Sequence, residues 1–264
     1  SAQSASAWKF AHATEIVGID IIPETRQNVE LSDGFFKKGN PDKVKTAYFV
    51  ADMCTNLKNH SELATVTLKT DLAVCNFAIH YAFRSAASLS TFLNNIRIFL
   101  KPGGYFVGTY MARQCIAVLP KQSETIPGFT YEGGGACTRV QTAQTAQTAQ
   151  TVWSIARTPG NDEEGGSIYG NAITVDIAER PLSHEYYINL DHPDVCQVFR
   201  QHGFVHVKES DWIRKRTLFQ FKTDREKLNP FEKRWADIHR QFVFKYDPEA
   251  TVVQRSEEHT SELK

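Results

Sequence analysis

Apolar runs in the first 110 positions have the length of buried strands. Residues 15–21, 46–52, 70–76 and 103–109 each form one such run, and we predict a strand for each. Before the fourth run, residues 89–100 place apolar side chains at i, i+3, i+4 and i+7 spacing. This spacing predicts a helix, which the Lys-Pro-Gly-Gly turn ends before the next strand begins. Strands that alternate with helices at this interval indicate a mostly parallel sheet.

The pattern changes after residue 111. Residues 120–167 hold few apolar positions and include a Gln-Thr-Ala repeat of period three at 141–151, so we expect a largely mobile insertion there. The segments that follow alternate as the strands of an antiparallel sheet do. Strands are expected at 169–177, 185–190, 204–208, 218–222 and 241–246, with a short helix at 193–202 that Gly203 ends.

Composition narrows the class of protein. The chain has 264 residues and a formal net charge of zero, so any contact with RNA must come from a local basic patch such as residues 214–216. The five cysteines are widely spaced and form no CxxC pair, which argues against a zinc site or a disulfide framework and fits a reducing compartment. No apolar run has the length that a membrane span needs.

Polar side chains follow three of the predicted strands. Asp20 and Asp52 end the first two. In an open α/β sheet the carboxyl ends of the strands line the ligand crevice, where a carboxylate can accept hydrogen bonds from ribose hydroxyls or an adenine amino group. The third strand end adds an amide, a stacking face, an imidazole and a phenol, from Asn76, Phe77, His80 and Tyr81.

Ordinary structural roles compete with this interpretation. Asp20 could cap a helix that begins near Pro23, and the third cluster could be a plain strand end. In nucleotide-binding folds a glycine-rich loop lies about 20 residues before the acid, which here falls at or before residue 1. We therefore expect the chain to begin just after a cofactor motif, with residues 5–13 as the helix that follows it. Three similar strand ends in succession favour the layout of an S-adenosylmethionine-dependent methyltransferase.

Several of these motifs are those of a known family. Asn76-Phe77 followed by His80-Tyr81, the Pro-Gly-Gly turn, and Glu185 in a His-Glu-Tyr-Tyr strand about a hundred residues later resemble the mRNA cap guanine-N7 methyltransferases. The resemblance covers residues 8–246 apart from the insertion. It implies an α/β, Rossmann-like class I methyltransferase fold with a mostly parallel sheet and antiparallel C-terminal strands. Residues 1–254 would form the methyltransferase domain fragment, with the first strand and glycine loop missing.

The resemblance also implies roles for individual residues. Asp20 would hold the ribose of S-adenosylmethionine and Asp52 would lie by its adenine. Asn76 would sit by its methionine end, and Tyr81 would contact the cofactor at its boundary with the guanine. The cap guanine would meet Phe77, His80, Tyr81 and Glu185. His80 and Tyr81 would position the reactants, with no general base and no metal. The implied substrate is the capped 5′ end of mRNA in the nucleus, with other capping-enzyme domains or an activating subunit as further partners.

The chain departs from the family pattern at three places. Asn76 stands where the family usually has Gln, residues 110–112 replace a Thr-Pro segment, and only Tyr246 is a candidate for a late tyrosine. Residues 255–264 look like a translated sequencing adapter and are left out of the domain. Because the first strand is expected to be missing, we expect the chain to bind S-adenosylmethionine weakly and to be weak or inactive as an enzyme. The alternatives are an inactive RNA-, cap- or partner-binding subunit, and a class I methyltransferase for another substrate.

Overall fold

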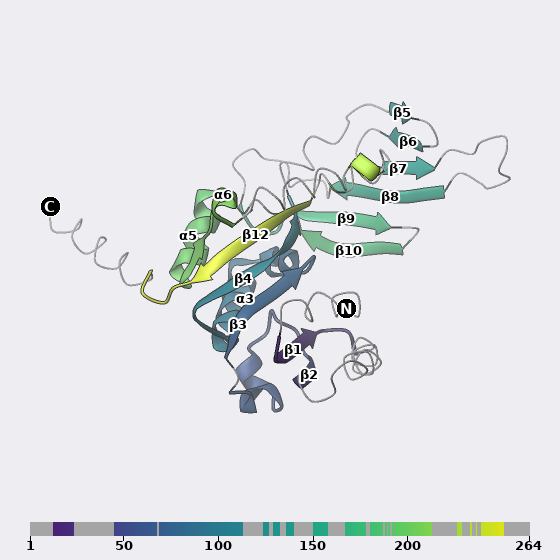
Figure 1. Cartoon of the computed structure of the whole chain (residues 1–264). Coiled ribbons are helices and arrows are strands. Elements are labelled where there is room, and N and C mark those ends of the chain that lie inside the picture. The colour runs from purple at the N-terminus through teal and green to yellow at the C-terminus, as the bar shows by residue number, and fades with distance from the viewer. Residues whose placement is uncertain are drawn as a thin grey trace. The chain divides into compact units, whose positions relative to one another are not determined.

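The structure, a computed structural model, divides into two compact units, residues 1–68 and residues 69–264 (Figure 1). Each unit is described by itself. The residues that the structure describes are 13–23, 45–67, 69–112, 124–126, 129–132, 136–139, 150–157, 167–177, 180–186, 188, 190, 192–212, 226–228, 233, 236 and 239–250.

The first unit contains a parallel pair of strands, β1 (Glu15–Asp20) and β2 (Lys45–Val50). Both agree with the apolar runs predicted from the sequence. Asp20 lies opposite Val50, and the Ala51 N–H donates to the Asp20 carbonyl over 2.9 Å, so the two strands end side by side. Two short 3-10 helices follow, η2 (Leu57–Asn59) and η3 (Leu63–Thr65).

The second unit is built around a four-stranded sheet with the order β11-β12-β4-β3. β3 and β4 are parallel, whereas β12 runs antiparallel to both β4 and β11. Parallel strands in both units and antiparallel strands at the C-terminal end confirm the predicted α/β, Rossmann-like class. The strands are β3 (Thr70–Asn76), β4 (Leu100–Met111), β11 (Phe204–His206) and β12 (His239–Tyr246).

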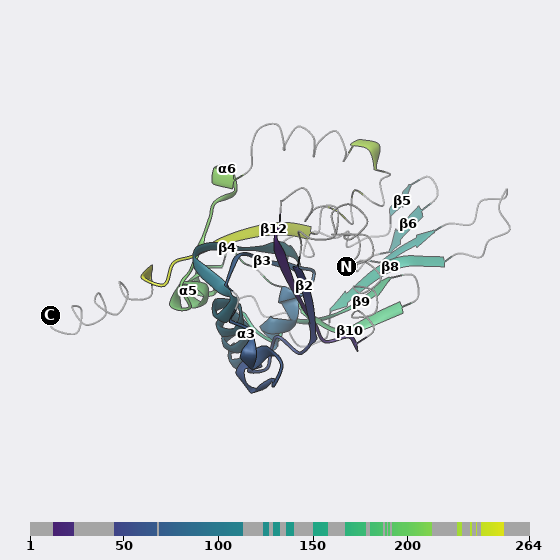
Figure 2. The same ribbon diagram turned by 60° about the horizontal axis from the view of Figure 1, so that its bottom comes forward.

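Two helices cover the same face of this sheet, α3 (Ala86–Phe99) and α5 (Pro193–Gln201) (Figure 2). Aromatic rings from both helices contact neighbouring positions on this face. The rings of Phe92 and Phe106 lie 6.1 Å apart, and those of Phe199 and Phe244 stack at 4.3 Å. Phe106 and Phe244 are paired in register. This aromatic layer is the core of the second unit.

The predicted turn before β4 is instead a bulge inside the strand. Thr70 pairs with Leu100 and Leu72 with Tyr105, so residues 101–104 lie opposite a single residue of β3, Asp71. Gly103 has φ +81°, a backbone conformation that glycine adopts without strain. The strand therefore begins earlier than the sequence predicts, because its first residue already pairs with β3.

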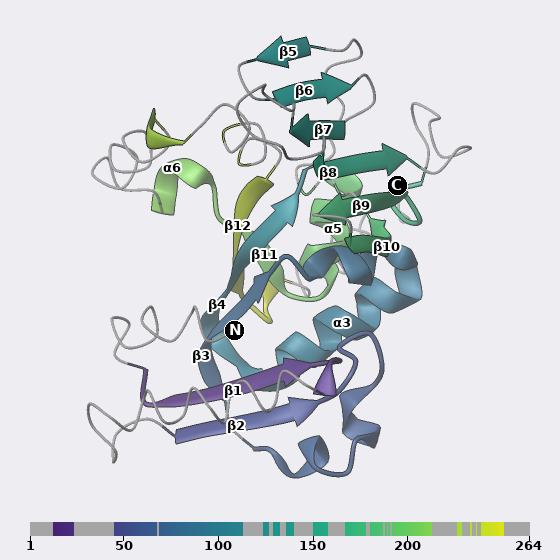
Figure 3. The same ribbon diagram turned by 90° about the vertical axis from the view of Figure 1, so that its right-hand side faces the viewer.

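The expected mobile insertion at 120–167 contains four strands, so this expectation is wrong for that part of the chain. A six-stranded antiparallel sheet runs in the order β10-β9-β8-β7-β6-β5 (Figure 3). Backbone hydrogen bonds between antiparallel neighbours do not require apolar side chains, which is why low hydrophobicity was a poor guide. The strands are β5 (Glu124–Ile126), β6 (Phe129–Glu132), β7 (Ala136–Arg139), β8 (Gln150–Arg157), β9 (Ala172–Ile177) and β10 (Arg180–Tyr186).

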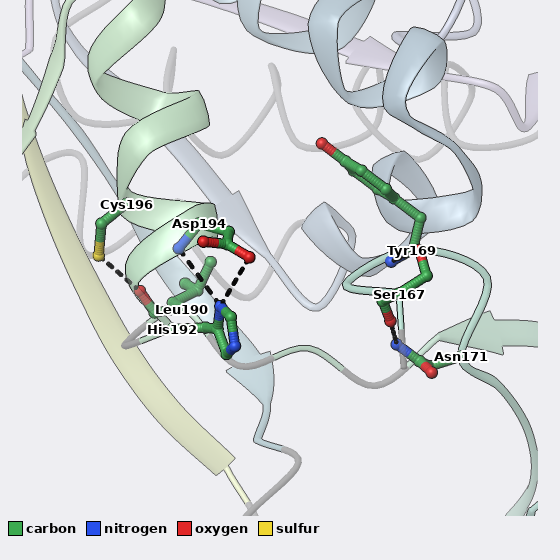
Figure 4. Close-up of polar contacts among 7 residues, drawn as sticks. All are labelled: Ser167, Tyr169, Asn171, Leu190, His192, Asp194 and Cys196. Atoms are coloured by element: carbon green, nitrogen blue, oxygen red, sulfur yellow. Dashed lines mark hydrogen bonds and ion pairs between the residues drawn. The ribbon is translucent and has the colours of Figure 1, made fainter. Parts of the chain in front are cut away.

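Short polar contacts hold the chain at both ends of β9 and β10 (Figure 4). His192 caps α5 by accepting the Asp194 N–H at Nδ1 over 3.3 Å, and the Cys196 thiol donates to the Leu190 carbonyl over 3.2 Å. Before β9, the Asn171 amide donates to the carbonyl of Ser167 over 2.9 Å. These local bonds fix where the six-stranded sheet leaves and rejoins the rest of the unit.

The remaining predicted elements are found with shifted bounds or lie outside the described residues. β10 ends where a strand at 185–190 was predicted, and β12 starts two residues before the predicted 241–246. α6 (Glu209–Trp212) was not predicted. The expectations for residues 5–12, 141–149, 218–222 and 255–264 all fall outside the part of the chain that the structure describes.

Candidate functional site

The two acids of the first unit hold the turns that follow their strands. Asp20 Oδ1 accepts the Ile22 N–H over 3.0 Å, and Asp52 Oδ1 accepts the Cys54 N–H over 2.7 Å. Both side chains are half-buried. These bonds give Asp20 a local capping role of the kind that the sequence left open. Each bond uses one carboxylate oxygen, and among the described residues no hydrogen bond engages Oδ2 of either acid.

The end of β3 is tied to the end of β4 by two hydrogen bonds. The Phe77 N–H donates to the Thr109 carbonyl over 3.0 Å, and the Thr109 hydroxyl donates to Asn76 Oδ1 over a longer 3.4 Å. Phe77 has φ +53°, in the left-handed region that a bulky side chain rarely adopts. Its side chain is 54% exposed. The backbone therefore holds an apolar ring out toward solvent at the strand end.

His80 and Tyr81 lie together on the 3-10 helix η4 (Ile79–Arg84), directly after β3. Their ring centroids are 4.2 Å apart, with planes at 52°. His80 is only 4% exposed, whereas Tyr81 is 44% exposed. Of the two, Tyr81 offers the surface that a ligand can reach, and His80 supports it from the interior.

Glu185 lies on β10, whose backbone contacts η4. The contact is reinforced where the Gly170 N–H donates to the Phe83 carbonyl over 2.9 Å. An isolated parallel bridge between Ala112 and Ile188 joins the end of β4 to the chain just after β10. The structure thus brings the strand that carries Glu185 to the helix that carries His80. The side chain of Glu185 lies outside the described part of the structure.

The sequence missed one residue at this edge, His239, the first residue of β12. Its ring lies edge-on to Phe77, with centroids 5.0 Å apart and planes at 89°. Extending the β12 prediction by two residues would have found it. Tyr246, the sequence candidate for a late tyrosine, is 7% exposed and packs on Phe204 at 5.4 Å, at the opposite end of β12. Tyr246 therefore lies away from the edge that carries Phe77 and His239.

The structure also shows the local role of residues 110–112, where the sequence departs from the pattern of the family that it resembles. Tyr110, Met111 and Ala112 are all buried, at 3%, 8% and 0% exposure. They continue β4 and carry it to the bridge with Ile188. This segment forms a buried extension of the strand, at the position where the resemblance implies a Thr-Pro segment.

Two kinds of feature are absent from the residues that the structure describes. These residues contain no group of three or more His, Cys, Asp or Glu side chains placed to hold a metal ion. Likewise, none of the helices in the described part is both long and apolar enough to cross a membrane. Within the second unit, the candidate site consists of the Asn76 amide and the rings of Phe77, Tyr81 and His239, which suit a flat heteroaromatic ligand.

Comparison with known proteins relates the N-terminal half of the chain to a family. Residues 5–132 match the model of a family described as the mRNA (guanine-N(7))-methyltransferase domain. This part of the chain is similar to the mRNA cap guanine-N7 methyltransferases. The matched residues include Asp20, Asp52, Asn76 and Tyr81, whereas Glu185 and His239 lie beyond the matched range.

Individual proteins of this name are also similar to part of the chain. The mRNA cap guanine-N(7) methyltransferase of Caenorhabditis elegans is 36% identical over 107 residues, 39% of this chain and 27% of that protein. The enzyme of the same name from Cryptococcus neoformans is 26% identical over 137 residues, which is 51% of this chain and 18% of that protein. The matched part of the chain thus spans about a quarter or less of these relatives.

Solved structures that are similar to this chain are also methyltransferases. The alignment with an S-adenosylmethionine-dependent methyltransferase from Clostridium acetobutylicum covers 93% of this chain and 89% of that chain, at 9% identity and a TM-score of 0.42. The alignment with one from Mesorhizobium loti covers 91% and 84%, at 13% identity and the same TM-score. The α/β class of this chain is read from the strand order described above.

Proposed function

We propose that this chain is part of an enzyme that transfers a methyl group from S-adenosylmethionine to N7 of the cap guanine of mRNA. The family match across the strand ends at Asp20, Asp52 and Phe77 carries the proposal. The substrate is then the capped 5′ end of an mRNA, and the product is the N7-methylated cap.

The chemistry of this reaction asks for positioning and no general base. Guanine N7 is nucleophilic and carries no proton to remove. S-adenosylmethionine, when bound, supplies a methyl group that the positively charged sulfonium already activates. The chain's own residues then have to orient N7, exclude water and supply a suitable electrostatic environment. The burial of His80 supports a positioning role, because a proton-transferring imidazole needs access to its reaction partner.

The exposed aromatic side chains support recognition of an unpaired base. Phe77 and Tyr81 follow the same strand and are 54% and 44% exposed. Proteins commonly bind splayed-out bases by stacking them on aromatic rings of this kind. Glu185 is proposed to accept hydrogen bonds from N1–H and the exocyclic amine, a charge-assisted pair that adenine cannot offer. The contact of β10 with η4 supports this assignment.

The acids of the first unit fit the sugar and base of the proposed cofactor. Asp20 and Asp52 stand at adjacent ends of parallel strands, and each has committed only Oδ1 to its own turn. A ribose hydroxyl can donate to the remaining oxygen of such a carboxylate, and the adenine amino group can do the same. We propose Asp20 for the ribose and Asp52 for the adenine. Asn76 is proposed for the methionine end, and Tyr81 for the boundary between the cofactor and the guanine.

A single-turnover assay tests the proposed function. The chain is used in excess over RNA with a radiolabelled GpppA cap, with S-adenosylmethionine at millimolar concentration so that weak cofactor binding does not hide the reaction. Nuclease digestion and chromatography should reveal N7-methylguanosine in the cap, and ApppA-capped RNA should stay unmodified. Absence of a methylated product, or a methyl group on another atom of the RNA, would refute the proposal.

Glu185→Gln tests the guanine contact in the same assay. The amide keeps the size of the side chain but can accept only through one oxygen, so the charge-assisted pair is lost. We expect the chain concentration that gives the half-maximal single-turnover rate to rise roughly thirtyfold, equivalent to about 2 kcal/mol. Glu249→Gln is the control, because Glu249 is an exposed glutamate just beyond β12. If both variants behave as the parent does, Glu185 does not read the base.

A further inference from the structure

The two rings that meet at the tip of β4 come from strands on either side of it. Phe77 follows β3, His239 begins β12, and β4 lies between these strands. Neighbouring strands are about 4.8 Å apart, which separates β3 from β12 by about 10 Å. The ring centroids are nevertheless only 5.0 Å apart. The two rings therefore approach each other across the end of β4.

Phe77 is the one described non-glycine residue with a positive φ. In the left-handed region Cβ crowds the following carbonyl, and a bulky residue stays there only where its surroundings hold it. Two contacts do so. The bond from the Phe77 N–H to the Thr109 carbonyl fixes the main chain, and the ring of His239 meets the side chain.

His239 is well placed to act as the fixed partner in this pair. It lies opposite Met111 in register, and Arg240 Nη1 donates to its carbonyl over 3.2 Å. His239 is half-buried, whereas Phe77 remains 54% exposed. The contact thus restrains Phe77 and still leaves much of its surface open to a ligand.

We propose that His239 is a positioning residue that holds Phe77 in its left-handed conformation, ready to receive the cap guanine. This inference rests on the proposed function. His239 acts through Phe77 and does not itself contact the base. A side chain that is already ordered loses less conformational freedom on binding, so the affinity for the base rises without a new contact.

The first test is the affinity of the full chain for the cap analogue GpppG, measured by calorimetry. His239→Ala removes the ring contact and should raise Kd about fivefold, the value of an edge-on aromatic pair. His239→Phe keeps an aromatic edge and should stay within about twofold of the parent. His206→Ala is the matched control. His206 contacts Phe244 in the same sheet at 5.2 Å, away from the tip of β4, and its loss should leave Kd unchanged.

A double-mutant cycle separates positioning from direct contact. In a Phe77→Ala background, His239→Ala should change Kd by less than about twofold, because the residue through which it acts is gone. If His239→Ala weakens binding equally with and without Phe77, His239 contacts the base directly and the proposal is wrong. The proposal is equally wrong if His239→Ala leaves Kd unchanged in the parent.

A measurement without ligand keeps this inference distinct from the proposed function. 4-Fluorophenylalanine at position 77 should give one sharp, shifted ¹⁹F resonance in the parent and in His239→Phe. His239→Ala should move it toward the position of a solvent-averaged ring. If the parent fails to prefer GpppG over ApppA, the proposed function fails, while the resonance still reports whether His239 holds Phe77. An unchanged resonance in His239→Ala overturns the inference.

Discussion

Replacing Gly108 with alanine should disrupt the sheet where β3 meets β4. A Cβ atom at Gly108 would lie 1.9 Å from the carbonyl oxygen of Cys75 and 2.7 Å from Cζ of Phe242. Real Cβ atoms essentially never approach other heavy atoms within 3.0 Å. The backbone of β3 must therefore move away by about 1 Å, because the nearest obstacle is main chain and cannot rotate aside.

The size of the effect follows from these contacts. Overpacking of a tightly packed interior typically costs about 1–3 kcal/mol. Displacing β3 also weakens the bonds beyond Gly108, including that from the Phe77 N–H to the Thr109 carbonyl, each worth about 0.5–1.5 kcal/mol. We expect Gly108→Ala to lower the free energy of unfolding by about 3–4 kcal/mol, a large share of the roughly 5–15 kcal/mol of a typical domain.

Urea titration followed by far-ultraviolet circular dichroism measures this loss. Gly103→Ala is the matched control, because Gly103 has φ +81° and a Cβ there meets no atom within 4 Å. It should lose only the roughly 1 kcal/mol that a left-handed backbone costs alanine. If the two variants lose equal stability, the contact with Cys75 does not limit the site and the steric argument is refuted.

Three further changes test other parts of the structure. Ser85→Ala removes the side-chain oxygen that accepts the Ser88 N–H at the start of α3, and should lower the free energy of unfolding by about 1 kcal/mol in the same titration; an unchanged midpoint would contradict the cap. Burial lowers the pKa of His202, whose ring shares a hydrogen bond with Ser90. The neutral ring therefore stabilises the fold above the ordinary pKa of histidine, and this stabilisation is lost as pH falls through the lowered pKa of His202. The melting temperature should fall as pH is lowered through this range, and it should fall less in His202→Gln. If the melting temperature depends equally on pH in both proteins, His202 is not the cause. Phe77→Gly should leave thermal stability within about 1 kcal/mol of the parent, because relief of the left-handed backbone offsets the lost ring contact, while GpppG affinity falls; retained affinity would exclude Phe77 from the site.

The sequence predicts the parallel strands well because each is a continuous apolar run, even where β3 leaves Leu72 and Val74 38% and 39% exposed. The run at 15–21 is found as β1 and the run at 70–76 as β3, with almost the predicted bounds. Continuous apolar runs of this length leave few other interpretations. The cluster from Asn76 to Tyr81 also follows β3 as predicted, so the local part of the candidate site is legible from sequence.

Features that depend on pairing between distant segments cannot be predicted from local sequence patterns. β5 to β8 form within a stretch of low hydrophobicity, because hydrogen bonds between the backbones of antiparallel strands do not require apolar side chains. Tyr246 and His239 lie on one strand, seven positions and about 23 Å apart. Only the register of β12 with β4 shows that His239 is at the end of β12 nearer Phe77, and this register cannot be predicted from the sequence of either strand alone.

The pairing of β4 with β12 has a consequence for synthesis of the protein. Met111 and His239 are partners in register, yet about 130 residues separate them along the chain. A ribosome that adds about 5–20 residues per second needs on the order of ten seconds to make that stretch. During this interval one side of β4 has no strand to bond with, and its apolar residues are open to chaperones or to misassembly. Translation speed between these two positions should therefore control the yield of soluble protein, even though neither partner strand is altered.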